Sequence, residues 1–137
     1  MIPILLDTCA LIWLAEEAPI AKAARDAITD AVADDQPIYI SPISGWEIGL
    51  LISSGRLRLP LPPDAWFERV LAAPGVQLVE LPLRVLIASS FLPGVPPRDP
   101  ADRIIAATAR NGDYRIMTRD RLLLDYAEQG HVKALAC

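Results

Sequence analysis

The chain has 137 residues, of which 53% are hydrophobic, and its formal net charge is -4. This length fits one folded domain with a sizeable core, and the acidic balance argues against nucleic-acid binding through net charge. The sequence contains neither a membrane-spanning apolar run nor a basic leader, and its two cysteines make no disulfide framework. We therefore expect a soluble cytoplasmic protein with one domain over residues 1–137. The high apolar content also favours a surface that a partner covers.

Apolar runs and helix start and stop residues predict the elements in chain order. The first half of the chain predicts a strand at 4–7, helices from 8 and over 19–34, a strand at 37–41, and helices over 44–55 and 63–73. The second half predicts a strand at 76–81, a helix over 83–91, a helix from 100, a strand at 114–118, a helix over 119–130 and a strand at 131–136. Strands that alternate with helices pair in parallel. We expect a three-layer α/β domain with a central, mainly parallel sheet of four to five strands flanked by helices.

The stretch RDPADRIIAATA at 98–109 holds two acids at the start of a helix. Asp99 suits the N-cap and Pro100 the first helical position, while Asp102 falls at the third, where an acid can complete a capping box. Both carboxylates also favour the positive end of the helix dipole. Locally, helix capping and catalysis explain these acids equally well.

Other acids follow predicted strands. Asp7 ends the first strand after an apolar run, and Asp120 follows the fourth strand in IMTRD. Glu47 is the single charged residue between Pro37 and Gly55. Each acid alone can be a turn or cap residue, but in open α/β sheets ligands bind beyond the carboxyl ends of the strands. We therefore expect these acids and Asp102 to share one crevice.

Four carboxylates in one crevice repel each other unless a cation is present. Ligands that are all oxygen favour a hard ion, Mg²⁺ or Mn²⁺, and the single histidine, His131, with two distant cysteines gives no zinc site. Acidic metal sites commonly serve phosphoryl chemistry, which implies an anionic substrate. A candidate phosphate rim is formed by Arg98, Arg103, Arg119 and Arg121. Taken singly, each arginine can equally belong to a solvated helix face.

Four blocks of the chain resemble the PIN domain, specifically the VapC-type ribonuclease toxins of bacteria. The blocks are ILLDT at 4–8, SPISGWEIGLL with GRL at 41–57, RDPADRIIAATA at 98–109 and TRDRLLLDY at 118–126. The resemblance runs nearly end to end. It implies the toxin of a type II toxin-antitoxin system: a Mg²⁺- or Mn²⁺-dependent endoribonuclease that cleaves structured RNA, tRNA or rRNA, through a metal-activated water, and that a cognate antitoxin holds inactive.

The resemblance also implies roles for particular residues. Asp7, Glu47, Asp102 and Asp120 match the family's acidic quartet, so they are the expected catalytic and metal-binding residues. Thr8, Asp99 and Thr118 match supporting positions, with Asp99 chiefly a helix cap. Asp7 and Asp102 would hold the principal ion, and either Asp120 or Glu47 would accept a proton.

The family's toxins commonly pair, so we expect a homodimer as well as an antitoxin. Candidate contact residues for either partner are Trp46, Leu50, Leu51, Leu57, Leu59, Trp66 and Phe67. Core packing is the competing interpretation for each aromatic side chain, and for Trp46 it is the one that we favour.

Other protein classes fit less well. A catalytically inactive PIN-like module that binds RNA or protein stays open, because an intact acidic quartet does not prove turnover. Dehalogenase-like phosphatases need a second acid two residues after the first, where this chain has Cys9. Receiver domains need a buried lysine near the last strands, for which Lys133 is the available residue.

Overall fold

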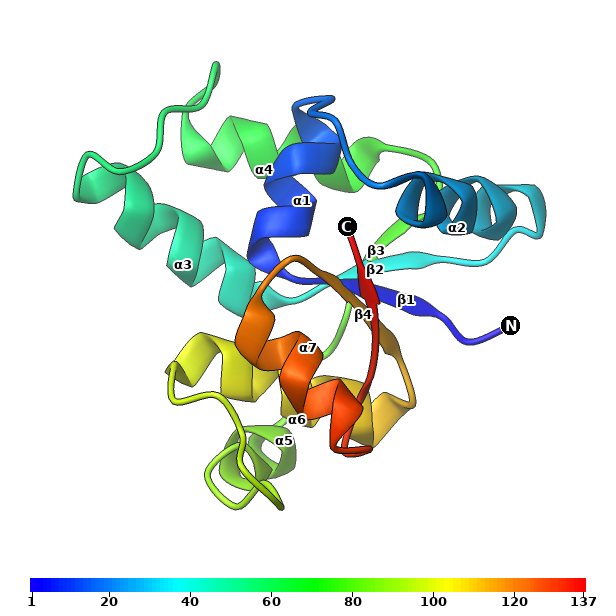
Figure 1. Cartoon of the computed structure of the whole chain (residues 1–137). Helices are drawn as coiled ribbons and strands as arrows, with labels where there is room; N and C mark the ends of the chain where they lie inside the picture. Colours follow the sequence, from blue (N-terminus) through cyan, green and yellow to red (C-terminus); the bar gives the residue numbers. More distant parts are fainter.

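The protein is described by a computed structural model that covers residues 1–137. Its centre is one sheet of five strands in the order β3-β2-β1-β4-β5 (Figure 1). Every pairing in the sheet is parallel. The strands are β1 (Ile4–Leu6), β2 (Ile38–Ile40), β3 (Val76–Leu78), β4 (Arg115–Thr118) and β5 (Lys133–Ala136). The predicted α/β class is confirmed.

Seven helices connect and cover these strands, and each corresponds to a predicted one. They are α1 (Thr8–Ala15), α2 (Lys22–Ala33), α3 (Pro42–Ser53), α4 (Pro63–Ala72), α5 (Leu83–Ala88), α6 (Pro100–Gly112) and α7 (Arg121–Glu128). The ends differ from the predicted ones by up to three residues: α2 begins three residues later than predicted, and α5 ends three residues earlier. Helix α3 begins two residues before its predicted start. It does so because the Ser41 hydroxyl accepts a hydrogen bond from the Ile43 amide at 3.2 Å and Pro42 takes the first helical position.

Alternating side chains of the buried strands divide the core between the two faces of the sheet. Ile4 and Leu6 pack on one face and Leu5 on the other, as a strand with a side-chain period of two requires. Helices α1, α2 and α4 cover the first face, while α6 and α7, with α5 against α6, cover the second (Figure 1). The predicted three layers are therefore present.

The direction in which successive strands are added to the sheet changes at β1. Strands β2 and β3 lie on one side of β1, and β4 and β5 lie on its other side. Ligands of open α/β sheets bind at such a switch point, beyond the carboxyl ends of the strands. The end of β1 at Leu6 and the end of β4 at Thr118 therefore mark where a site is expected. No helix has the length and apolarity needed to span a membrane.

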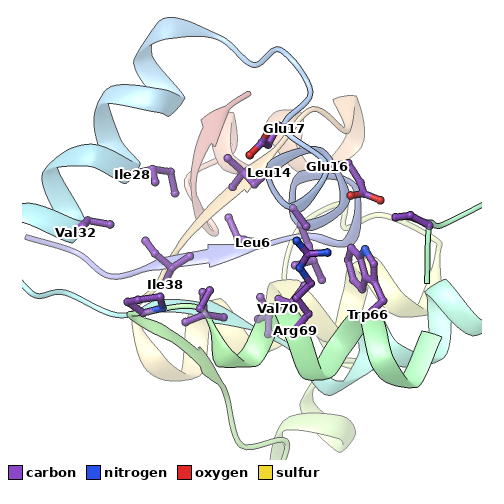
Figure 2. Close-up of a pocket in the computed structure, with 17 residues that line it drawn as sticks. Leu6, Leu14, Glu16, Glu17, Ile28, Val32, Ile38, Trp66, Arg69 and Val70 are labelled. Carbon is purple, nitrogen blue, oxygen red and sulfur yellow. The ribbon is translucent and has the colours of Figure 1, made fainter. Parts of the chain in front are cut away.

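A cavity of about 600 Å³ opens on the face covered by α1, α2 and α4, and Figure 2 shows its lining. The lining is mostly apolar and includes Leu6, Leu14, Ile28, Ile38, Trp66 and Val70. The charged side chains in it are Glu16, Glu17 and Arg69, all of which are exposed. None of the predicted site acids lines this cavity.

Candidate active site

Asp7 is the residue directly after β1, and it caps α1. Its side chain is 4% exposed. One carboxylate oxygen accepts the Ala10 amide at 2.8 Å, and the other accepts the hydroxyl of Thr118 at the end of β4. The carboxylate therefore lies buried at the junction of the two central strands.

Thr118 and Asp120 continue this arrangement into α7. The Thr118 side chain is fully buried, and its hydroxyl oxygen accepts the Asp120 amide at 2.9 Å. Asp120 in turn caps α7 by accepting the Leu123 amide at 3.1 Å. A continuous set of hydrogen bonds thus joins Asp7, Thr118 and Asp120.

Glu47 is held by a second hydroxyl network, which includes a residue that the sequence analysis missed. The Thr8 hydroxyl donates to a Glu47 carboxylate oxygen. Because that hydroxyl has a single proton, Ser44 must be the donor in the 2.9 Å hydrogen bond between the two hydroxyls. Ser44 is fully buried and lies three residues before Glu47 on α3. That helical spacing is the sequence signal that points to it.

Asp99 and Asp102 have separate structural roles at the start of α6. Asp99 caps the helix by accepting the Asp102 amide at 3.0 Å, so the predicted cap is confirmed. Asp102 sits at the third helical position, and its carboxylate accepts no hydrogen bond. The Asp102 carboxylate is therefore left free of the capping interaction.

Burial and mutual repulsion act on these carboxyl groups. Burial, followed by the charges of the neighbouring acids, raises the pKa of Asp102 to about 8. Burial also raises the pKa of Asp7, against the lowering effect of its hydrogen bonds from Thr118 and Ala10. The pKa of Glu47 is raised by burial in the same way, opposed by the Thr8 hydroxyl. The site therefore disfavours several negative charges at once.

Cys9 is a second residue that the sequence analysis did not place in the site. Burial and then the charges of Asp7, Glu47, Asp102 and Asp120 raise the pKa of its thiol to about 11. The charges of all four acids therefore reach this one thiol. The thiol stays protonated near neutral pH and is a poor nucleophile there.

No basic side chain neutralises these carboxylates. The ion pairs of the chain are Lys22 with Asp26, Arg121 with Asp125, and Lys133 with Asp113. Lys133 is thus paired with an acid outside the quartet, which removes the receiver-domain interpretation. In this conformation no three acidic, histidine or cysteine side chains lie close enough together to hold one metal ion. The donor set suits a hard divalent cation in chemistry and charge, but its side chains must move closer together to bind one.

The four arginines of the predicted phosphate rim differ in their surroundings. Arg98 is exposed and precedes Asp99, while Arg103 follows Asp102 and makes one long contact, 3.5 Å, to the Ser89 carbonyl. The Arg121 guanidinium is paired with Asp125 at 3.5 Å. The Arg119 guanidinium stacks on an aromatic ring within the chain.

The candidate partner contacts divide between core and surface. Trp66 is 3% exposed, and Leu57, Leu59 and Phe67 pack against the core. Trp46 is 54% exposed and Leu50 is 49% exposed, so these two lie on the surface of α3. Core packing is therefore correct for Trp66 and incorrect for Trp46.

Comparisons with known proteins identify the family of this chain. Residues 4–129 match the family model of the PIN domain, a range that includes all four acids. The chain is 34% identical over 124 residues to Ribonuclease VapC22 of Mycobacterium tuberculosis, covering 90% of this chain and 91% of that protein. The chain belongs to the PIN domain family, in its VapC group.

Solved structures share the fold of this PIN domain. One is VapBC2 from Rickettsia felis bound to a DNA fragment from its promoter, with a TM-score of 0.65, 11% identity, and coverage of 98% of each chain. Another is FitAcB from Neisseria gonorrhoeae, with a TM-score of 0.55, 22% identity, and coverage of 96% of each chain. At these identities the likeness concerns the fold of the PIN domain alone.

Proposed function

We propose that this PIN domain is a Mg²⁺- or Mn²⁺-dependent endoribonuclease, the cytoplasmic toxin of a bacterial type II toxin-antitoxin system that cleaves structured RNA such as tRNA or rRNA. The observation that carries the proposal is the arrangement of the acids at the switch point of the sheet: hydroxyl hydrogen bonds join Asp7 to Asp120 and connect Glu47 to Thr8, and no basic side chain pairs with any of these acids or with Asp102. Neighbouring carboxylates at partly buried positions repel each other, and either a proton on one of them or a bound cation relieves that repulsion. The name of the relative Ribonuclease VapC22 supports the reaction class.

The four acids are the proposed ligands of a divalent ion. Asp7 and Asp102 are its principal ligands, and Glu47 and Asp120 complete the set. Each Asp7 oxygen already accepts one hydrogen bond but keeps a further lone pair, so the Thr118 and Ala10 contacts fix its orientation without blocking it. When bound, Mg²⁺ or Mn²⁺ activates water and neutralises charge on the scissile phosphate.

Basic side chains next to the acids bind the RNA backbone. Arg98 and Arg103 are the chain neighbours of Asp99 and Asp102, so their backbone lies beside that of the proposed site. Both are free of acidic partners. Arg119 and Arg121 were expected in the same set, but their guanidinium groups are engaged within the protein. We therefore assign the main phosphate contacts to Arg98 and Arg103.

The cognate antitoxin is the proposed protein partner. The cavity over α1, α2 and α4 is large and apolar enough to receive the apolar face of an amphipathic segment (Figure 2). The exposed charges of Glu16, Glu17 and Arg69 at this cavity can fix the register of such a segment. The antitoxin complexes among the solved structures of this fold support a partner of this kind.

The proposal is tested by cleavage of a structured RNA pool in Mg²⁺, in Mn²⁺ and in EDTA. We expect metal-dependent cutting that Asp7→Asn and Asp102→Asn reduce by at least about a hundredfold, because each removes a charged ligand of the ion. Asp64→Asn is the matched control, since Asp64 also lies in the first turn of a helix but is exposed on α4.

Two outcomes would contradict the proposal. Activity of Asp7→Asn within a few-fold of the parent would refute the ligand assignment. A folded, antitoxin-free protein that cuts no RNA with either metal would favour the catalytically inactive binding module.

A further inference from the structure

The Arg119 side chain connects three separate parts of the chain. Its guanidinium carbon lies 3.9 Å from the ring centroid of Trp13 on α1. One terminal nitrogen of the same group donates to the carbonyl oxygen of Cys137 at 2.9 Å and to that of Pro19 at 3.4 Å. A planar guanidinium can stack through its face while its edge donates hydrogen bonds, which an ammonium group does less well.

The segments that Arg119 connects are those that carry two of the site acids. Asp7 caps α1, the helix that contains Trp13, and Arg119 itself lies between Thr118 and Asp120. The Thr118 hydroxyl donates to Asp7 and accepts the Asp120 amide. The guanidinium therefore spans the same two elements that this hydroxyl joins within the site.

The main chain at the end of β5 completes the connection. The Cys137 amide donates to the Thr118 carbonyl at 3.0 Å, and the Cys137 carbonyl accepts the Ala21 amide at 3.1 Å in addition to Arg119. Without the guanidinium, Cys137 would keep only two of these hydrogen bonds, one with the Thr118 carbonyl and one with the Ala21 amide. The corner between β4 and α7 would then be held to α1 less firmly.

We propose that Arg119 is a positioning residue, which holds α1 against the corner between β4 and α7 so that Thr118 and Asp120 stay beside Asp7. It acts through those residues, and its charge is not used to bind an RNA phosphate. The inference rests on the proposed nuclease function, but its structural part does not require metal or RNA.

The first test compares Arg119→Ala, Arg119→Lys and Trp13→Leu, singly and in the double variant Trp13→Leu/Arg119→Ala. We expect kcat to fall about tenfold in each of the first three with KM within about twofold, because small displacements of reacting groups cost rate more than binding. The double variant should lose little more than either single variant, since both act on one contact. Trp13→Phe, which keeps an aromatic ring, should recover most of the rate.

The second test needs neither metal nor RNA. Hydrogen exchange followed by NMR should show faster exchange of the Asp120 and Leu123 amides in Arg119→Ala, because these amides are bonded to the side chains that Arg119 positions. Amides of β2 should keep their protection. Titration with Mn²⁺ should show several-fold weaker binding. Arg110→Ala is the matched control, since the Arg110 side chain also donates to a backbone carbonyl, that of His131, but away from the acids.

A different pattern would overturn the proposal. If Arg119 binds RNA phosphate, Arg119→Ala should raise KM, lower the salt dependence of binding by about one ion, and leave amide exchange unchanged, while Trp13→Leu keeps full activity. RNA cleavage by the wild-type protein distinguishes failure of this positioning proposal from failure of the proposed nuclease function. If wild-type protein cuts no RNA but the exchange result is as expected, the nuclease proposal fails and the positioning of Thr118 and Asp120 stands.

Discussion

The protonation of Asp102 is the main electrostatic consequence of the site. Its folded-state pKa of about 8 lies above the ordinary value of 3.8, because the carboxyl group is buried among other acids. Between these two pH values the folded state holds a proton that the unfolded state has released. The stability of the metal-free protein should therefore fall as pH rises from about 4 to about 8, and level off above that range.

This protonation makes metal binding depend on pH. At about pH 6.5 we expect Mg²⁺ or Mn²⁺ to displace close to one proton from Asp102, because a carboxylate must be ionised to act as a ligand. Affinity should then rise with pH up to about 8. Calorimetric titration in two buffers of different ionisation enthalpy measures the released proton. The same titration well above pH 8 is the control, and a heat that does not depend on the buffer at the lower pH would refute the assignment.

At the scale of elements, capping and site chemistry use the same positions. The helices α1, α6 and α7 each begin with an aspartate N-cap, Asp7, Asp99 and Asp120 respectively. A helix that follows a strand of a parallel sheet starts at the carboxyl edge, where the site lies, so its cap faces the crevice. Capping and catalysis are therefore compatible for Asp7 and Asp120, whereas at α6 the cap is Asp99 and the freer carboxylate is Asp102.

Substitutions at Asp99 distinguish the stability that its capping hydrogen bond provides from the stability that its negative charge provides. Asp99→Ala should lower the free energy of unfolding by about 1 kcal/mol, because the Asp102 amide loses its acceptor. Asp99→Asn should keep most of that stability, since asparagine is an equally good cap. Urea denaturation measures both effects. Equal losses in the two variants would show that the charge of Asp99, and not its hydrogen bond, stabilises α6.

At the scale of the molecule, the two cores leave apolar side chains on the outside. Trp46 and Leu50 lie four residues apart on α3, so both project from the same side of that helix, and both are about half exposed. Apolar groups that share a helix face are typical of a surface covered by another chain. The expected homodimer would bury this face of α3.

Light scattering at micromolar concentration tests the homodimer. We expect the mass of two chains for the parent and of one chain for Leu50→Glu, because a charge placed in an apolar contact is costly to bury. Val32→Glu is the control, since Val32 is 57% exposed on α2, away from α3. A parent protein that scatters as a single chain would contradict the dimer.

The sequence by itself determined the elements, their order, the aspartate caps of α1, α6 and α7, and the acids at the strand ends. The elements and caps depend on side-chain period and on proline and cap residues, all of which are local in the chain. The general rule that ligands bind at the carboxyl edge of a parallel sheet then points to the acids that follow the strands. Even the spacing between Ser44 and Glu47 was present in it, although the hydroxyl network was not foreseen.

The tertiary structure decided which distant groups meet. The Thr118 hydroxyl contacts Asp7 from 111 residues away, Ser44 contacts Thr8 across 36 residues, and the exposed Arg119 stacks on Trp13. The pKa of Asp102 likewise depends on burial and on acids from other elements. No local pattern specifies such contacts, because they exist only after the sheet has brought the ends of β1 and β4 together.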